Sequence, residues 1–295
     1  MLSQLSYRPL TENRDALRVR VDCILMRAFL LGLASAGVLG CTAKTPPLRL
    51  GTTYTVEQSG ALALLDSLHP SVPLRVIVGA SGQILRSAAA GDLDVVLTHA
   101  PSLEQRLLLT PGHAALRCPF VASRFAIVGP AAEPARVAAA RTAAEAFQRI
   151  AAARAGFVSR GDSSGTHVKE LSLWKAAGVS PGERDSWYVQ AGVDQAATLR
   201  IADERGAYAL ADLPTFTRLQ DLDLRVLFTA DTALGNPYTL YVMRSPSAHP
   251  GAARFAAWAL TDWRSRLLAL QLSSGTAAFA PLPGGCTAPP PVAAP

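Results

Sequence analysis

The sequence predicts an α/β protein in which helices pack against a largely parallel sheet. From residue 48 onward, short apolar runs alternate with amphipathic segments of helical length, which is the pattern of strand–helix–strand units. The chain has 295 residues, 49% of them hydrophobic, which is ample for a buried core. A chain of this length and style is large enough for two α/β lobes.

The first half of this pattern contains four strands, each ended by glycine, proline or polar residues. A helix is expected between the first and second strands, over residues 59–68, and another begins at residue 82. The strands are predicted at residues 48–53, 74–79, 94–100 and 125–130.

The second half starts with a capping box, in which Thr142 and Glu145 open a helix. Another helix, residues 166–177, follows a strand and ends at Gly178, a residue suited to a helix C-cap. The remaining strands are predicted at residues 155–160, 207–212, 224–229 and 238–243, and a long helix at 251–271. The proline-rich end, residues 281–295, is expected to be disordered.

The N-terminal region has the layout of an export signal. Its uncharged apolar run, residues 28–40, is much shorter than the ~20 residues that span a bilayer. Cys41 follows directly, so residues 1–40 resemble an upstream extension and a bacterial lipoprotein signal, with Cys41 as the lipidated residue. A plain secretory signal is the alternative, and translation starts at either Met1 or Met26.

The net charge and the cysteines limit the kinds of ligand and site that the chain is expected to have. Five Arg and three acidic residues precede Cys41, so the net charge falls from +6 to +4 for the exported part. A mild positive excess favours small anionic ligands or anionic surfaces, and no basic run points to nucleic acid. Cys118 and Cys286 could form a disulfide in an exported protein, a question that the sequence leaves open. No metal-binding or P-loop motif occurs, and we expect neither a metal nor a cofactor.

Three loops that follow predicted strands are rich in glycine and hydroxyl groups. Ligands of open α/β sheets collect at the carboxyl ends of strands, and the first turn of a helix attracts anions through its unpaired N–H groups. Arg160 would add a full charge and a fork of donors. The alternative for any single loop is that its Ser and Thr only cap helices. The candidate oxyanion ligands are Thr52, Thr53 and Thr55, then Ser81 and Gly82, then Arg160, Ser163, Ser164, Gly165 and Thr166.

The third loop also contains a G-x-S-x-G pattern over residues 161–165, which suits a serine nucleophile between a strand and a helix. A nucleophilic Ser163 needs a histidine base and an acid. His167 lies beside the motif and His249 lies in a turn, so neither is well placed. We expect His99 to be buried at a strand end and His167 to donate a hydrogen bond in a first helical turn. The sequence therefore favours binding over catalysis, and we assign no catalytic residue.

Three segments resemble the tungstate-binding proteins that serve ABC importers. They are TTYTVEQSG at 52–60, SGQILRSAAAGDLDVVLTHAP at 81–101 and FVSRGDSSGTHVKELSLWKAAGVSP at 157–181. The resemblance covers residues 48–280 and includes the three donor-rich loops. It departs from the family at Tyr54 and Val56, which replace threonines, and at Ala80, which replaces a glycine.

The resemblance implies a type II periplasmic-binding fold, with two α/β lobes joined by two crossover strands and an anion bound in the cleft. Lobe 1 would comprise residues 41–124 and 237–280, and lobe 2 residues 125–236. The crossovers would lie near residues 120–129 and 236–243. It also implies an extracytoplasmic or periplasmic, lipid-anchored monomer that delivers tungstate, or molybdate, to an ABC permease. An oxyanion sensor domain and a serine hydrolase are the alternatives from other classes.

The choice between tungstate and phosphate depends on whether the anion carries a proton. Tungstate and molybdate carry no proton near neutral pH, so a site made of donors suits them, whereas hydrogen phosphate needs an acceptor. Asp162 is the one acidic residue in the third loop. It could accept such a proton, pair with Arg160 or face solvent, and a phosphate-binding protein therefore remains an alternative.

Overall fold

The fold was analysed in a computed structural model that describes residues 46–182 and 184–289, all within the compact unit Thr45–Pro295. The predicted export signal, the lipidation of Cys41 and residues 290–295 lie outside this range. Among the described residues, no helix combines the length and the apolar composition needed to cross a bilayer.

The first group of strands forms a sheet with β1 (Leu48–Thr53) between two parallel neighbours, β2 (Leu74–Gly79) and β3 (Val95–Thr98). β3 pairs with β9 (Gly235–Met243) in the antiparallel sense. The helices of this part of the chain are α1 (Tyr54–Gln58), α2 (Ala61–Ser67), α3 (Ser81–Ala89) and α4 (Pro101–Glu104), with a π-helical turn at Gln105–Leu109. We call these elements lobe 1.

The helix predicted at residues 59–68 is wrong in its boundaries, because α1 and α2 are separate. Gly60 adopts a left-handed conformation with φ of 84° and starts a second helix, which glycine does without steric penalty.

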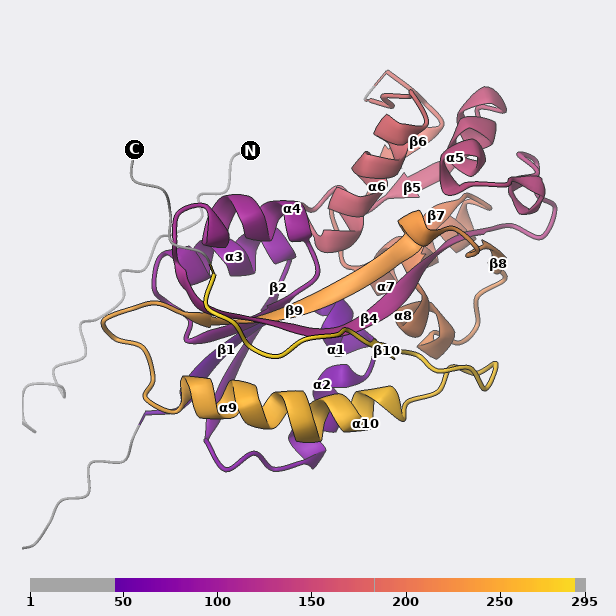
Figure 1. The fold of residues 1–295 in the computed structure, drawn as a ribbon. Helices are drawn as coiled ribbons and strands as arrows, with labels where there is room; N and C mark the ends of the chain where they lie inside the picture. Colours follow the sequence, from indigo (N-terminus) through magenta and orange to yellow (C-terminus); the bar gives the residue numbers. More distant parts are fainter. Residues whose placement is uncertain (1–45, 183, 290–295) are drawn as a thin grey trace, which may run out of the picture. The chain divides into compact units, whose positions relative to one another are not determined.

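Both faces of the lobe 1 sheet are buried, as the alternation along β3 shows. Leu97 belongs to the hydrophobic cluster that includes the C-terminal helical segment, whereas Val96 packs with residues of α3 and α4, as expected when successive side chains point to opposite faces. The C-terminal segment comprises α9 (Ala252–Trp258), a π-helical turn (Ala259–Trp263) and α10 (Arg264–Leu268). Figure 1 shows it on one side of the strands, with α3 and α4 on the other.

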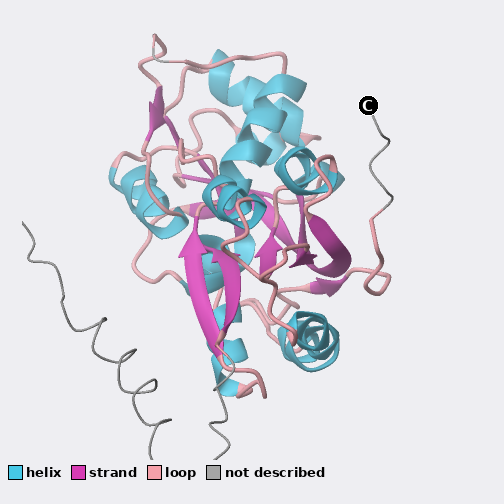
Figure 2. Ribbon diagram, turned by 90° about the vertical axis from the view of Figure 1, so that its left-hand side faces the viewer, coloured by secondary structure: helices cyan, strands magenta, loops and turns pink. Residues whose placement is uncertain are grey.

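The second group of elements, which we call lobe 2, surrounds the far end of β4 (Ala114–Gly129). β7 (Ala209–Asp212) and β8 (Arg225–Phe228) pair with β4 in the antiparallel sense, and β5 (Phe157–Ser159) pairs with β6 (Tyr188–Gln190) in parallel. Helices surround these strands in Figure 2. They are α5 (Ala143–Ala152), α6 (Gly165–Ala176), α7 (Gln195–Glu204) and α8 (Leu213–Arg218), with 3-10 turns at Val137–Ala139 and Thr232–Leu234.

The strands are therefore mixed in direction, whereas the sequence predicted a largely parallel sheet. β1, β2 and β3 are parallel, as predicted, but β4 and β9 run antiparallel to each other for most of their length. The reason is that β4 and β9 are long crossover strands, and they are not the ends of strand–helix–strand units.

β4 and β9 link the two lobes. β4 pairs with β9 as far as Arg124 and then, from Phe125 on, with β7 and β8. At this transition Ser123 lies opposite Asn236. The predicted fold of two α/β lobes joined by two crossover strands is thus present (Figure 1). The exact residues at which one lobe ends and the other begins stay a prediction.

The C-terminal segment corrects the prediction of a disordered tail from residue 281. β10 (Ala280–Pro281) pairs with β4, and Thr287 forms an isolated bridge with Arg117. Between them, Cys286 forms a disulfide with Cys118 of β4. Sequence composition alone suggested disorder because proline-rich segments bury little apolar surface, but a covalent link and strand pairing hold this segment as far as residue 289.

Two predicted helix ends are confirmed. Thr142 caps α5, with its Oγ1 accepting the Glu145 N–H at 3.1 Å. α6 ends at Ala176, and Gly178 adopts φ of 69° just beyond it. Helix α7 was not predicted, although Asp194 caps its start by accepting the Ala197 N–H at 2.9 Å.

Candidate functional site

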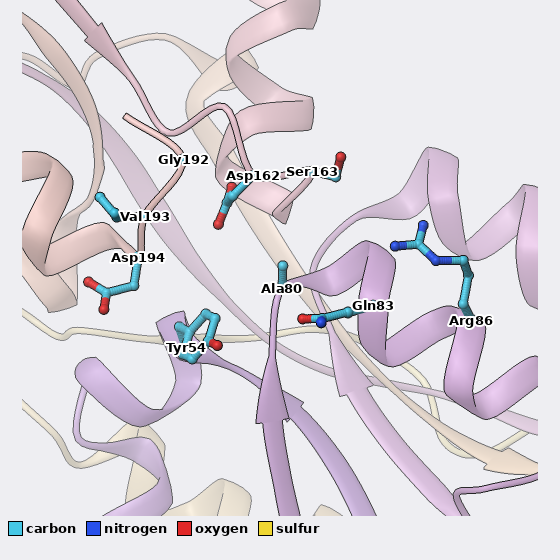
Figure 3. Close-up of a pocket in the computed structure, with 9 residues that line it drawn as sticks. All are labelled: Tyr54, Ala80, Gln83, Arg86, Asp162, Ser163, Gly192, Val193 and Asp194. Atoms are coloured by element: carbon cyan, nitrogen blue, oxygen red, sulfur yellow. The ribbon is translucent and has the colours of Figure 1, made fainter. Parts of the chain in front are cut away.

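The donor-rich loops open onto one cleft of about 540 Å³. Tyr54 begins α1 directly after β1, Ala80 comes from the loop after β2, and Asp162 and Ser163 come from the loop after β5 (Figure 3). The structure therefore brings together the three loops that the sequence singled out. Each lies where a strand ends and α1, α3 or α6 begins.

A fourth loop, residues 192–194, also lines the cleft, and the sequence analysis missed it. Asp194 caps the start of α7 in lobe 2, and Tyr54 begins α1 in lobe 1. The two residues therefore lie on opposite sides of the cleft (Figure 3). The available signal was Asp194 itself, an acidic residue placed just before a helix-forming run. Gln83 and Arg86 of α3 complete the lining and are exposed.

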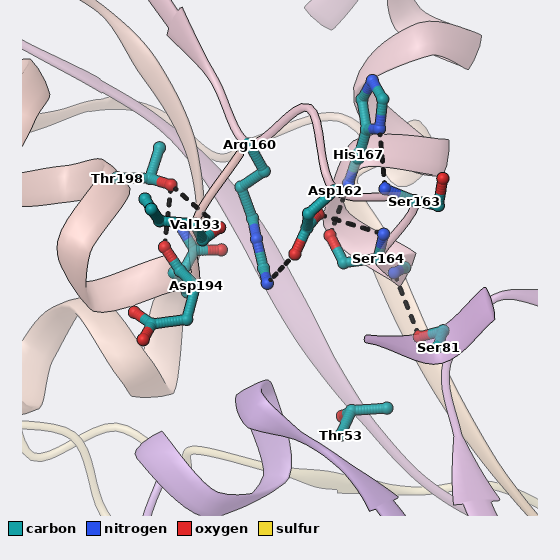
Figure 4. Close-up of polar contacts among 12 residues, drawn as sticks. Thr53, Ser81, Arg160, Asp162, Ser163, Ser164, His167, Val193, Asp194 and Thr198 are labelled. Carbon is teal, nitrogen blue, oxygen red and sulfur yellow. Dashed lines mark hydrogen bonds and ion pairs between the residues drawn. The ribbon is translucent and has the colours of Figure 1, made fainter. Parts of the chain in front are cut away.

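Loops two and three contact each other directly, so part of their hydrogen-bonding capacity is used between the lobes. The Gly82 N–H donates to the Ser163 carbonyl at 3.2 Å, and the Gly165 N–H donates to Ser81 Oγ at 3.0 Å (Figure 4). These bonds fix the start of α6 against the start of α3. They place Ser81 and Gly82 at the site, in contact with lobe 2.

Arg160 is the main charged group of the site. It follows β5 and its side chain is only 1% exposed. Its Nη2 donates to the Asp162 carboxylate, whereas its Nε and Nη1 have no partner among the described residues. Burial lowers the pKa of the guanidinium, and the charge of Asp162 opposes this shift. Buried N–H donors without acceptors are costly, so this fork is suited to an anionic ligand.

The threonine hydroxyls divide into two groups. Thr52 Oγ1 donates to the Leu97 carbonyl at 3.3 Å, and Thr53 Oγ1 accepts the Val56 N–H at 3.4 Å as the N-cap of α1. Thr55 and Thr166, in contrast, have buried hydroxyls with no partner among the described residues. The capping interpretation thus holds for Thr53, whereas Thr55 and Thr166 retain free hydroxyls for a ligand.

The start of α6 shows what Ser163 and Ser164 do. Ser164 Oγ caps the helix by accepting the His167 N–H at 3.2 Å. The backbone N–H of Ser163, not its hydroxyl, donates to His167 Nδ1 at 3.1 Å. Nδ1 therefore accepts, which leaves the ring hydrogen on Nε2, and the donation by His167 to a neighbour or to the anion stays a prediction. In the described part of the chain, no imidazole is hydrogen-bonded to Ser163 Oγ, and this geometry supports binding over nucleophilic attack.

Asp162 is occupied by donors of its own loop. One carboxylate oxygen accepts from Arg160 Nη2, and the other accepts the Ser164 N–H at 3.0 Å (Figure 4). Of the three roles left open by the sequence, the structure shows the pairing with Arg160. Asp162 thus balances the charge of the guanidinium and holds it in place.

His99 is buried at the end of β3, as predicted, with 2% of its surface exposed. Its Nδ1 lies 2.9 Å from Asn236 Oδ1, and its pKa is lowered to about 4 by burial. The ring lies against Gly165, where an added Cβ would come within 2.6 Å of His99 Cε1. His99 is therefore neutral at physiological pH and packs directly beneath the third loop.

The chain matches a known protein superfamily. The model of the PBP superfamily domain matches residues 42–262, which is more than half of the chain. The chain belongs to the PBP superfamily. Tungstate-binding protein TupA of Peptoclostridium acidaminophilum is 30% identical to it over 84% of this chain and 93% of its own length. This PBP superfamily member is thus TupA-like, in agreement with the resemblance seen in the sequence.

Two further proteins similar to the PBP superfamily member carry names that refer to ABC transporters. A Haloferax volcanii protein, provisionally named an ABC transporter anion-binding protein, is 38% identical over 70% of this chain, a match that spans 62% of its own length. The crystal structure of the tungstate ABC transporter from Geobacter sulfurreducens has a TM-score of 0.65 and 38% identity, and covers 73% of this chain and 94% of that chain.

The described residues offer no alternative metal centre. No three His, Cys, Asp or Glu side chains gather within residues 46–182 and 184–289 in a way that could hold a metal ion. Among the predicted ligands Ser163 lines the cleft, beside the carboxylates of Asp162 and Asp194, whereas the buried guanidinium of Arg160 reaches this lining through Asp162. A buried guanidinium with unpaired donors is the chemistry of an anion site.

Proposed function

We propose that this protein is the extracytoplasmic solute-binding component of an ABC importer and that it captures tungstate between its two lobes. The observation that carries the proposal is the buried Arg160, whose Nε and Nη1 have no partner in the described structure. Thr55 and Thr166 contribute free buried hydroxyls near the starts of α1 and α6. Named relatives that bind tungstate support this choice of anion.

The chemistry of the site favours an unprotonated oxyanion over hydrogen phosphate. Both carboxylate oxygens of Asp162 already accept hydrogen bonds from Arg160 and Ser164. A protonated anion would have to compete for this acceptor, whereas tungstate and molybdate only accept hydrogen bonds. We propose that the ligands of the anion are drawn from Thr52, Thr53, Thr55, Ser81, Gly82, Arg160, Ser163, Ser164, Gly165 and Thr166.

Delivery to a permease completes the proposed function. Closure of the lobes over the bound anion would present one surface to the membrane partner, as in other hinge-closing binding proteins. We propose that the protein acts as a monomer held at the membrane by a lipid on Cys41, which lies outside the described residues.

Calorimetric titration of the purified protein with tungstate, molybdate, sulfate and phosphate tests the proposal. We expect tight binding of tungstate and molybdate, with phosphate weaker because Asp162 is occupied and its proton would have to be accepted by Asp194, whose Oδ1 already caps α7. Tight phosphate binding without tungstate binding would overturn the choice of anion and keep the anion site. No binding of any of the four would overturn the proposed function.

A further inference from the structure

Asn236 joins four other buried side chains at the point where the crossover strands leave lobe 1. Its Nδ2 lies 2.9 Å from Asp212 Oδ1, 3.0 Å from Ser123 Oγ and 3.1 Å from the Tyr238 hydroxyl, and its Oδ1 lies 2.9 Å from His99 Nδ1. Each of the five residues is at most 3% exposed. We call Asn236, Asp212, Ser123, Tyr238 and His99 the crossover network.

The network contains residues of both lobes and of both strands that join them. Ser123 and Asn236 lie opposite each other on β4 and β9. Asp212 belongs to lobe 2, where its other oxygen caps α8 by accepting the Thr215 N–H at 3.2 Å. His99 belongs to lobe 1, at the end of β3. One amide side chain therefore connects lobe 1, lobe 2 and both strands between them.

The network also reaches the anion loop. The His99 ring stacks on Tyr238, with centroids 4.9 Å apart, and lies so close to Gly165 that a Cβ there would meet Cε1 at 2.6 Å and the His99 carbonyl at 2.8 Å. Gly165 is the first residue of α6, whose N–H donates to Ser81. A shift of α6 toward a bound anion would therefore be transmitted to His99 and from it to Asn236.

The orientation of the Asn236 amide follows from its neighbours. Its NH₂ group faces the Asp212 carboxylate, which only accepts when ionised, so Oδ1 faces His99 and accepts the Nδ1–H. A rotation at the crossover must preserve these bonds or exchange them together, since a buried polar group left without a partner is costly. Such a network has a few discrete arrangements rather than a continuous range.

We propose that Asn236 is the positioning residue that couples oxyanion binding to closure of the lobes. It contacts no anion itself and acts through His99 and Gly165 on one side and through Ser123 and Asp212 on the other. This inference rests on the proposed function, because it concerns how the binding of an anion changes the relation between the lobes.

The test uses Asn236→Asp and Asn236→Ala in the full chain. Tungstate affinity is measured by calorimetry, closure by the change in radius of gyration on adding tungstate, and stability by thermal melting. We expect both variants to lose affinity by about 5- to 150-fold, the range of typical coupling between sites, and to contract less than wild type.

Asn236→Asp adds a readout that a purely structural role would not produce. The introduced carboxyl would lie beside the Asp212 carboxylate, and two such groups share a proton as the pH falls. The other groups facing this position are His99 and Tyr238, with Arg160 and Asp162 beyond His99. We expect this variant to recover affinity and contraction as the pH is lowered and the pair takes up a proton, whereas Asn236→Ala should not recover relative to wild type.

Thr98→Val is the matched control. Thr98 precedes His99, is fully buried and donates to Glu104 Oε1 at 2.8 Å, but it lies outside the crossover network. We expect it to lower the melting temperature and to leave tungstate affinity and contraction unchanged. If the Asn236 variants do not fold, the double variant Ser123→Ala/Tyr238→Phe, which removes two of the three oxygens around Nδ2, should still lose affinity by more than Thr98→Val.

The outcomes separate the two proposals. If wild type binds none of the oxyanions, the proposed function and the inference both fail. If wild type binds and contracts, and the folded variants match it in affinity, contraction and pH dependence, the inference alone is overturned. An equal loss of affinity in Thr98→Val would also overturn it, because the effect would then follow stability and not the network.

Discussion

Arg160 concentrates the chemistry of the site in one side chain. It is buried, it carries a full charge that only Asp162 balances through a direct hydrogen bond, and it keeps two donor nitrogens free in the described structure. Hydrogen bonds between charged groups are stronger than neutral ones, and a guanidinium presents them in a fixed geometry. Ser163 lies in the same loop, but its side chain is exposed, and among the described residues its hydroxyl has no charged hydrogen-bond partner.

Arg160→Ala should therefore weaken tungstate binding far more than Ser163→Ala. We expect a loss of about 100-fold or more for Arg160→Ala and less than about tenfold for Ser163→Ala, because only the first removes a charge and several donors. Calorimetric titration of both variants measures the difference. Similar losses in the two variants would show that the charge is not central to the site.

Glu170 is a buried titratable group on α6, the helix whose first turn lies at the site. Its Oε1 accepts from the Tyr188 hydroxyl at 2.8 Å and from Trp174 Nε1 at 3.1 Å. Burial raises the pKa of its carboxyl to about 7. Since the folded protein binds this proton more tightly than the unfolded chain, the stabilisation is present at low pH and is lost as the pH rises from about 4.5 through about 7.

We expect Glu170→Gln to remove this part of the pH dependence. Wild type should lose up to about 3 kcal/mol of unfolding free energy at this position between about pH 4.5 and about pH 8, and the variant should lose none of it. Urea denaturation of both proteins across this range measures the difference between their slopes. Parallel curves would mean that the Glu170 carboxyl has the same pKa in the folded and unfolded protein.

At the scale of elements, the beginning of α6 is constrained by three separate contacts. It is capped by Ser164, tied to α3 by the Gly165 N–H and packed against His99. Glycine at residue 165 is required by this close approach, because a side chain would overlap both the imidazole ring and the His99 backbone. The same approach places the first N–H groups of α6 at the cleft.

Gly165→Ala should therefore destabilise the protein by about 1–3 kcal/mol, as inserting a methyl group into a packed site usually does, and should also weaken anion binding. Gly182→Ala is the control, since a Cβ there meets no atom within 4 Å. Denaturant unfolding and tungstate titration of both variants test this. Wild-type behaviour of Gly165→Ala would show that His99 can move away without loss.

At the scale of the whole molecule, the two lobes share β4 and β9, and the C-terminal segment is fastened to β4 outside the cleft. The disulfide joins Cys118 and Cys286, which are 168 positions apart in the sequence. The chain between them includes all of lobe 2. A cross-link of this span restricts the unfolded chain strongly. The disulfide therefore contributes to the stability of both lobes together.

The double variant Cys118→Ser/Cys286→Ser should lose about 2–5 kcal/mol of unfolding free energy, chiefly because the unfolded chain gains freedom. Denaturant unfolding of the variant and of wild type with and without reductant measures the loss. Tungstate affinity should be unchanged, since neither cysteine lines the cleft. Equal stability of the oxidised and reduced forms would contradict the prediction.

The sequence by itself determined many of the local elements and the residue types of the three loops. The strands that end at Thr53, Gly79 and Ser159 were predictable because apolar runs ended by glycine and hydroxyl residues are a local signal, and the motifs also indicated the family and the class of fold. The start of α5 and the end of α6 followed from capping residues in the same way, since a cap acts within a few residues.

Only the tertiary structure decided which of these groups remain free for a ligand. Ser81 and Gly82 contact lobe 2, Asp162 pairs with Arg160, and Asn236 lies within hydrogen-bonding distance of a histidine 137 residues away in sequence. The antiparallel course of β4 and β9 and the fastening of the C-terminal segment also depend on such distant pairings. Local sequence patterns carry no information about which distant residues meet, because burial and hydrogen bonding are settled only when the whole chain packs.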